Sequence, residues 1–278
     1  MTLIRVAHSP DSDDAFMFYA LAKGLIDTGN YEFEHVLDDI ETLNREAIAG
    51  TYDVTAVSIH AYAHLDETYA LLASGASMGD GYGPVVVARE PVPGDRLREV
   101  EVAIPGTLTS AALALKLWNP GLNTTVRRFD DITPAVLAGD VDAGVVIHEG
   151  QLTWEDDGLV CLVDLGAWWA GQTGGLPLPL GGNVIRRDLG DETMAQVAGL
   201  LRGSIEYSLE NRDQALDYAL GFGRGLDRRQ ADRFVGMYVN ELTVDYGERG
   251  RRAVREFLGR AHVARLIPRM PTLDFLGG

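Results

Sequence analysis

His148 is the residue whose position in the sequence best suits proton transfer. The segment GVVIHEGQLTW, residues 144–154, places it at the end of a short apolar run and directly before a turn. An imidazole with its ordinary pKa of ~6.5 can accept a proton near neutral pH. A lone histidine is more often structural, however, and Glu149 would point to the opposite face of the strand. The sequence therefore leaves both roles open and indicates no group that orients the ring.

A second group of candidate residues lies in AVSIHAY, residues 56–62. Ser58 and His60 would point to one side of a strand, and Ile59 to the other. Ser58 can contact a ligand or cap the helix that follows, and the sequence leaves both roles open, whereas the structural role is favoured for His60. No GxSxG pattern surrounds Ser58, so nothing indicates a nucleophile elbow.

The segment AIPGTLTSAALALKL, residues 103–117, predicts a strand, a glycine turn and an apolar helix. Thr109 and Ser110 stand where this helix begins. Hydroxyls and free backbone amides at a helix start can bind a carboxylate without a cationic side chain. The alternative is that Thr109 is merely the helix cap. No Gly-Lys-Ser/Thr follows, so the segment is not a phosphate-binding P-loop.

The acidic segment HSPDSDD, residues 8–14, lies where the first strand gives way to its helix. Its serines and aspartates can cap the helix, and the amides near Ser9 could hold an anion or a substrate hydroxyl. The three aspartates Asp11, Asp13 and Asp14 could suggest a hard metal ion. The alternating ligands and closing glutamate of an EF-hand are missing, so capping is favoured and no metal is predicted.

These residues must be positioned by an alternation of short β-rich runs and longer helical patterns, which indicates an α/β fold. The expected strands are residues 3–9, 31–39, 52–62, 83–92, 101–106, 126–132, 143–149 and 176–189, and the expected helices are residues 13–26, 40–51, 63–73, 110–120 and 133–142, with a helical region from 191 onward. The pattern predicts two lobes with a cleft between them. Lobe 1 comprises residues 1–90 and 186–278, lobe 2 comprises residues 91–185, and the helical C-terminal part packs on lobe 1. Ligands of such folds usually bind between the lobes.

Composition excludes several function classes. The chain has 278 residues and a net charge of -17, which argues against a nucleic-acid partner. No stretch approaches the ~20 apolar residues of a membrane span, and the start MTLIRVAHS does not resemble a signal peptide, so we expect a cytoplasmic protein. Cys161 lies in an apolar run and is expected to be buried. Trp168 and Trp169 precede the last strand and could wall the cleft or pack in the core.

Six segments in order carry a family resemblance: HSPDSDDAFMFYAL, YDVTAVSIHAY, GYGPVVVAR, AIPGTLTSAALALKL, AGVVIHEGQLTW and LPLPLGGNVIRRDL. Over residues 4 to 190 the chain resembles the 1,4-dihydroxy-6-naphthoate synthases of the futalosine route to menaquinone. The resemblance implies a two-lobed α/β fold like that of periplasmic solute-binding proteins. It also implies a lyase that splits cyclic dehypoxanthinylfutalosine into 1,4-dihydroxy-6-naphthoate and dihydroxyacetone without a metal or organic cofactor.

The resemblance also implies roles for individual residues. His148 matches the family's proton-accepting histidine, and Thr109 with Ser110 match its substrate-holding pair. Ser58 and its neighbour Ile59 match a strand end that contacts the substrate. We therefore expect a small carboxylated substrate, with Ser9 and Trp169 as further contacts.

One segment departs from the family pattern. Where the family often has Ser-Pro-Cys-Pro-Asn-Asp, this chain has SPDSDD, which adds negative charge beside the cleft. Two alternatives remain: an enzyme like chorismate dehydratase of the same pathway, and a non-catalytic solute-binding protein.

Overall fold

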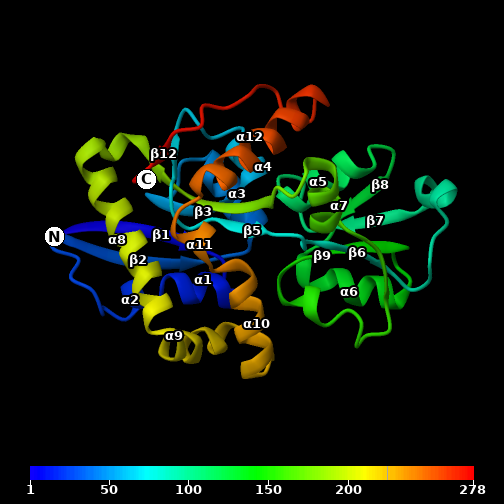
Figure 1. The fold of residues 1–278 in the computed structure, drawn as a ribbon, viewed down its shortest axis with the longest axis horizontal. Coiled ribbons are helices and arrows are strands. Elements are labelled where there is room, and N and C mark those ends of the chain that lie inside the picture. Colours follow the sequence, from blue (N-terminus) through cyan, green and yellow to red (C-terminus); the bar gives the residue numbers. More distant parts are fainter. Residues whose placement is uncertain (224) are drawn as a thin grey trace.

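Two β-sheets divide the protein into two lobes that lie side by side (Figure 1). The computed structural model describes residues 1–223 and 225–278. Both chain ends belong to the larger lobe, while the middle of the chain forms the smaller one (Figure 1). This confirms the predicted α/β fold with two lobes. Within the described part of the chain, no helix is both long and apolar enough to cross a membrane.

The first lobe is built on a seven-stranded sheet with the order β12-β4-β11-β3-β1-β2, in which β5 also pairs with β11. Its strands are β1 (Thr2–His8), β2 (Tyr31–Leu37), β3 (Val54–Ser58), β4 (Tyr69–Leu72), β5 (Ser77–Gly79), β11 (Leu178–Arg186) and β12 (Phe275–Leu276). The central strands β1, β2 and β3 are parallel, and β11 runs antiparallel to β3 and β4. The carboxyl ends of β1 and β3 therefore lie at the same edge of this sheet.

The second lobe is built on a five-stranded sheet with the order β10-β6-β9-β7-β8. Its strands are β6 (Val85–Ala88), β7 (Glu101–Ile104), β8 (Asn123–Val126), β9 (Ala143–Val146) and β10 (Val160–Asp164). The strand β7 is parallel to both β8 and β9, so β7 and β9 also end at one edge. The chain passes from one sheet to the other several residues earlier than the predicted lobe boundaries. The strand β6, before residue 91, already belongs to the second sheet, and most of β11, before residue 185, already belongs to the first.

Helices cover the faces of both sheets (Figure 1). The α-helices are α1 (Ser12–Met17), α2 (Tyr19–Ala22), α3 (Ile40–Ile48), α4 (Ile59–Tyr62), α5 (Ser110–Trp118), α6 (Phe129–Ala138), α7 (Leu165–Thr173), α8 (Asp191–Glu210), α9 (Arg212–Ala219), α10 (Arg228–Tyr238), α11 (Glu241–Val244) and α12 (Gly247–Val263). The 3-10 helices in the described part of the chain are η1 (Gly94–Glu99), η2 (His148–Leu152), η3 (Arg187–Leu189) and η4 (Leu220–Phe222).

The C-terminal helices pack on the first lobe, as predicted. The helices α8, α9 and α10 contact α1, and α12 lies against β11. Apolar side chains of α1, α8, α9 and α10 share one buried core with β1 and β3. A second core joins α4 and α12 of the first lobe to α5 and α7 of the second. The C-terminal helices therefore pack against α1, the helix that follows β1 and lies next to the space between the lobes.

Several predictions about local structure are wrong. Residues 59–62 form the helix α4 rather than the end of a strand. Residues 69–72 form the buried strand β4 rather than part of a helix, because a short apolar run has the same pattern in both structures. No strand covers the predicted residues 126–132 beyond Val126, where β8 ends. The helix α6 begins at Phe129 instead, with Asp130 and Asp131 in its first turn, where acidic residues favour a helix. Cys161 is exposed rather than buried.

Candidate active site

A cleft between the lobes collects most of the predicted site residues. It encloses about 730 Å³ of empty space, counted to its open mouth. The predicted residues that line it are Ser9, Ser58, Thr109, Ser110 and His148. They follow or end the strands β1, β3, β7 and β9, so the site lies at the carboxyl ends of strands from both sheets.

His148 begins η2 in a backbone conformation that side-chain-bearing residues seldom adopt. Its φ is 56°, in the left-handed region, which costs ~1–2 kcal/mol for a residue with a Cβ. The strand β9 ends at Val146, and the turn directs the chain into the cleft. The ring of Phe129 meets the imidazole edge to face, with the centroids 4.8 Å apart. Such strain is typical of functional sites, where the surroundings hold the residue in place.

Asp11 of the first lobe orients the imidazole of His148 in the second. Asp11 Oδ2 lies 2.7 Å from His148 Nδ1, and the Asp11 side chain is 1% exposed. Burial alone would lower the pKa of His148, but the charge and hydrogen bond of Asp11 outweigh it and raise the pKa to about 9. The charges of Glu149 and Asp13 act in the same direction. No local sequence pattern indicates this contact, because its two partners, Asp11 and His148, lie 137 residues apart in the chain.

Ser9 links Asp11 to Asp14 in the segment 8–14, and the other two aspartates of this segment titrate unusually. Ser9 Oγ lies 2.7 Å from Asp11 Oδ2 and 2.9 Å from Asp14 Oδ2, and Ser9 N donates to Asp14 Oδ2 at 2.7 Å. Burial and the charge of Asp11 raise the pKa of Asp14 to about 6. Burial and the charges of Asp14 and Asp11 raise the pKa of Asp13 well above its ordinary value. Ser9 therefore organises the acidic side of the cleft.

Glu149 makes a second contact between the lobes beside His148. Its Oε1 accepts from Ser12 Oγ at 3.2 Å and from Ser12 N at 3.4 Å. Ser12 belongs to the first turn of α1, so the contact joins α1 to η2. Glu149 therefore contacts α1, and Asp11 contacts the Nδ1 atom of the imidazole.

Thr109 and Ser110 border the cleft, and the structure gives each of them a structural hydrogen bond. Thr109 is the N-cap of α5, because its Oγ1 accepts from Ala112 N at 3.2 Å. Ser110 Oγ donates to Leu180 O at 2.6 Å and accepts from His60 N at 3.1 Å. The capping role of Thr109 is thus confirmed. Thr109 Oγ1 also donates to Gly106 O at 2.9 Å, so both hydroxyl protons are already used, and a carboxylate would have to displace one of these bonds or bind the backbone amides. Binding of a carboxylate here stays a prediction.

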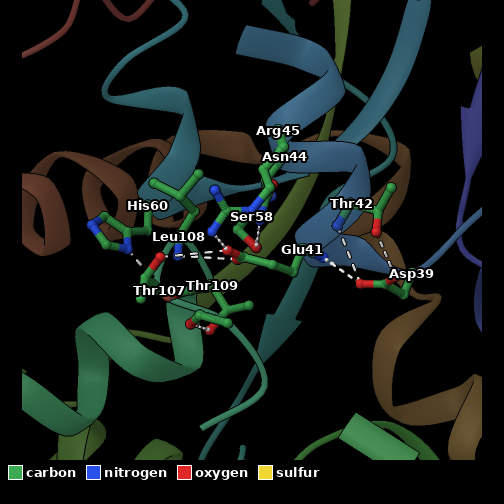
Figure 2. A network of polar contacts seen from close by, with 11 residues as sticks. Asp39, Glu41, Thr42, Asn44, Arg45, Ser58, His60, Thr107, Leu108 and Thr109 are labelled. Atoms are coloured by element: carbon green, nitrogen blue, oxygen red, sulfur yellow. Dashed lines mark hydrogen bonds and ion pairs between the residues drawn. The ribbon is translucent and has the colours of Figure 1, made fainter. Parts of the chain in front are cut away.

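Ser58 is held at the end of β3 by Asn44 of α3 (Figure 2). Ser58 N donates to Asn44 Oδ1 at 2.8 Å, and Asn44 Nδ2 donates to Ser58 Oγ at 3.1 Å. The Ser58 side chain makes no capping bond to α4. Its neighbour His60 lies with Nδ1 3.2 Å from Thr109 O, and burial lowers its pKa to about 4. His60 is therefore a neutral, structural histidine.

Glu41 of α3 reaches across to the loop that precedes α5 (Figure 2). Its Oε2 accepts from Leu108 N at 3.1 Å, and its Oε1 lies 3.4 Å from Thr107 Oγ1. Arg45 Nη2 donates to Glu41 Oε1 at 2.7 Å within the same helix. A carboxylate of the first lobe thus already occupies the loop amide just before the cap residue Thr109. The backbone amides at the start of α5 are therefore the nearest amides to which a substrate anion could bind.

Two predicted contacts are corrected by the structure. Ile59 is completely buried in the core beneath the first sheet and does not line the cleft. Trp169 is also completely buried, where it packs against Phe257 and donates from Nε1 to Pro177 O at 3.0 Å. Both side chains therefore have core roles.

Other residues take the place that was predicted for Trp169. Phe234 and Tyr238 of α10 line the cleft, as does Gln151 of η2, whose side-chain amide lies 2.6 Å from the Tyr238 hydroxyl. The helix α10 has an ordinary amphipathic pattern, and nothing in it signals a site.

The cleft is acidic on one side and rich in hydroxyls on the other. Among the described residues, those that line it include no lysine or arginine. A protonated His148 would be the positive charge closest to a bound anion. Within the same residues, no group of three or more histidine, cysteine or acidic side chains is arranged to hold a metal ion. The site can therefore move a proton at His148 and bind an anion through hydroxyls and backbone amides.

The two sheets with a cleft between them define the class of the fold, which is that of the two-lobed solute-binding proteins. The alkanesulfonate-binding protein of Xanthomonas axonopodis superposes with a TM-score of 0.70 at 13% identity, covering 97% of this chain and 95% of that one. At this identity the likeness concerns the fold alone.

Sequence comparison is more specific. Residues 4–263 match a protein family described as menaquinone biosynthesis, and this chain belongs to that family. A 1,4-dihydroxy-6-naphthoate synthase of Thermus thermophilus is 40% identical over 98% of each chain, and one of Streptomyces coelicolor is 37% identical over 95% of each. A crystal structure of a protein from Archaeoglobus fulgidus superposes with a TM-score of 0.90 at 50% identity, covering 95% of this chain and 98% of that one.

Proposed function

We propose that this protein is a carbon-carbon lyase that converts cyclic dehypoxanthinylfutalosine into 1,4-dihydroxy-6-naphthoate and dihydroxyacetone. The observation that carries the proposal is the imidazole of His148, which lines the cleft and is fixed at Nδ1 by a buried carboxylate. Relatives that are 40% and 37% identical over nearly the whole chain bear the name of this synthase. We also propose that the protein works in the cytoplasm.

His148 is the general base of the proposed reaction. With the proton of the neutral ring held on Nδ1 by Asp11, Nε2 carries the lone pair that accepts a proton. Removal of a proton from the substrate is followed by cleavage of the carbon-carbon bond that releases dihydroxyacetone. The other product contains a new aromatic ring, whose stability favours cleavage. No step requires a redox change.

The substrate carboxylate is retained in the product and needs a site of its own. The start of α5 offers backbone amides and the hydroxyls of Thr109 and Ser110, with Ser58 nearby. Binding there would fix the distance between the reacting carbon and His148. Phe234 and Tyr238 supply an apolar wall for the flat ring. The described residues that line the cleft include no lysine or arginine, which is consistent with an anion that is held by backbone and hydroxyl dipoles.

The test is to incubate the purified protein with cyclic dehypoxanthinylfutalosine and to follow 1,4-dihydroxy-6-naphthoate by absorbance and mass. We expect His148→Ala to lower kcat by a factor of ~10²–10⁴, which is the usual contribution of a general base. Cys161→Ala is the control, because Cys161 is exposed and outside the cleft. A folded parent protein that forms no product would overturn the proposed reaction. Equal rates for the parent and His148→Ala would overturn the role of the histidine.

A further inference from the structure

We propose that Asp11 is the positioning residue of His148 and that, since the two belong to different lobes, the complete base exists only when the lobes are closed. This inference rests on the proposed role of His148 as a base. It is carried by one contact across the cleft, Asp11 Oδ2 to His148 Nδ1 at 2.7 Å.

The Asp11 carboxylate is held firmly on its own lobe. Asp11 follows β1 and is the N-cap residue of α1. Its backbone carbonyl accepts from Ala15 N at 2.9 Å. Ser9 Oγ lies 2.7 Å from the same oxygen that contacts His148. A carboxylate fixed in this way selects the tautomer of the neutral ring with the proton on Nδ1.

The imidazole, in contrast, has only partial support from its own lobe. The ring of Phe129 packs against it there, and the printed polar contact of the ring, at Nδ1, comes from Asp11 of the first lobe. The neighbouring contact, Ser12 to Glu149, also joins the two lobes. Separation of the lobes would therefore remove the hydrogen bond at Nδ1 and the adjacent anchor of η2 together.

Lobe closure also changes the charge around His148. The groups that face the ring from the first lobe are Asp11, Asp13 and Asp14, and Glu149 is its neighbour in the second. Burial disfavours the protonated ring, but these carboxylates raise the pKa of His148 to about 9. Three of the four belong to the first lobe, so the ring loses most of this effect when the lobes separate. The closed protein is consequently the stronger base.

These changes give a balanced proton cycle. In the open protein His148 is closer to its ordinary pKa of ~6.5 and is largely neutral at neutral pH. Closure over the substrate raises the proton affinity of Nε2, which takes the proton from the substrate. Asp11 stays ionised throughout and stabilises the imidazolium. Reopening lowers the proton affinity again, and the proton passes to water.

The first experiment measures His148 directly by NMR. Protein with ¹⁵N-labelled histidine is titrated, and the His148 signals are identified by their loss in His148→Gln. We expect the Nδ1-protonated tautomer in the unmodified protein and a pKa lowered by more than ~1 unit in Asp11→Asn. Asp27→Asn is the matched control, because Asp27 is an exposed aspartate of the first lobe that lies outside the cleft and accepts from Gly29 N at 2.9 Å in its own loop. An unchanged pKa in Asp11→Asn would overturn the proposal.

The coupling to closure needs a second comparison. The His148 titration is repeated with saturating 1,4-dihydroxy-6-naphthoate, and the change in pKa on binding is compared between the unmodified protein and Asp11→Asn. A smaller change in Asp11→Asn supports coupling, because that variant retains only the effect of the ligand's own charge. Equal changes in the two proteins would overturn it. If Asp11→Asn fails to fold, an Nε2-protonated neutral His148 in the unmodified protein would still overturn the positioning role.

Kinetics separate this proposal from the proposed function. We expect Asp11→Asn to lower kcat at least ~10-fold, to change KM little and to move the limb of the pH profile, with Asp27→Asn unchanged. If the unmodified protein forms no product, the lyase proposal fails while the NMR result still decides the role of Asp11. If Asp11→Asn retains the full rate and the same pH profile, the positioning role fails and the lyase stands.

Discussion

The Glu41 contact predicts that a single carboxylate sets much of the balance between open and closed lobes. Glu41 is 9% exposed and accepts from Leu108 N at 3.1 Å across the cleft (Figure 2). Glu41→Ala removes this acceptor and leaves the rest of α3 in place. Because Glu41 and Leu108 belong to different lobes, their bond stabilises the closed form relative to the open one and contributes little to either lobe alone.

The magnitude follows from the type of bond. A hydrogen bond to a charged group contributes ~1.5–3 kcal/mol, which corresponds to a factor of ~10–150 in the ratio of closed to open protein. The ion pair with Arg45 adds little, because the Arg45 side chain is 62% exposed and exposed helical pairs contribute ~0.3–0.5 kcal/mol. We therefore expect Glu41→Ala to lower the closed population at least ~10-fold.

Two assays measure this effect, and one of them needs no ligand. Amide hydrogen exchange at His60, whose N–H donates to Ser110 Oγ of the second lobe at 3.1 Å and does not contact Glu41, should become faster by the same factor. The Kd of 1,4-dihydroxy-6-naphthoate, measured by calorimetry, should rise at least ~10-fold, because binding then has to drive closure. The matched control is Glu46→Ala on the same helix, where Glu46 Oε2 accepts from Thr51 Oγ1 at 2.7 Å inside the first lobe. Exchange at His60 that is the same in Glu41→Ala and Glu46→Ala would refute the reasoning.

Two further predictions concern packing and titration. An added Cβ at Gly166 would overlap the Tyr82 carbonyl, whereas Gly171 in the same helix α7 has open space. Gly166→Ala should therefore lower Tm by an amount equivalent to ~1–3 kcal/mol, and Gly171→Ala should raise it slightly; equal shifts would contradict this. Burial lowers the pKa of His60 to about 4, so the unfolded chain, with a pKa of ~6.5, binds more protons between these values. Stability is thus lost as pH falls through this window, and His60→Gln should reduce the difference in unfolding free energy between pH 7 and pH 5 by ~2 kcal/mol in urea titrations, whereas an unchanged difference would refute it.

Much of the fold could be predicted because the signals are local. Apolar runs followed by helix starts gave both sheets, and the return of the C-terminal helices to the first lobe was expected. The misassigned segments are those in which local pattern is ambiguous. Residues 69–72 are all buried, and four apolar residues in a row do not distinguish a strand from a helix.

The site was predictable in its positions and not in its partners. Strand ends located Ser9, Ser58, Thr109 and His148 at one cleft, since parallel strands end at a common edge. The partner Asp11 was not predictable, because its contact arises only where two separately folded lobes meet.

The predicted substrate contact of Trp169 is wrong because its ring packs in the core instead of facing the cleft. Trp169 comes just before the last long strand, but α7 turns its ring toward Phe257 of α12, a helix that the local sequence does not indicate as a neighbour.

The placement of His148 shows what a catalyst adds to a solute-binding fold. Hydroxyls and a helix start between two lobes are sufficient to hold an anion, but a proton acceptor must also keep one geometry and one tautomer. His148 adopts a left-handed backbone that costs ~1–2 kcal/mol, so its own lobe would not favour this conformation without other contacts. Phe129 of its own lobe packs against the ring, and two polar contacts come from the first lobe, from Asp11 to the ring and from Ser12 to Glu149. On the proposed coupling, contacts between the lobes therefore help to maintain the strained turn, and the geometry required for proton transfer is complete only while the lobes are together.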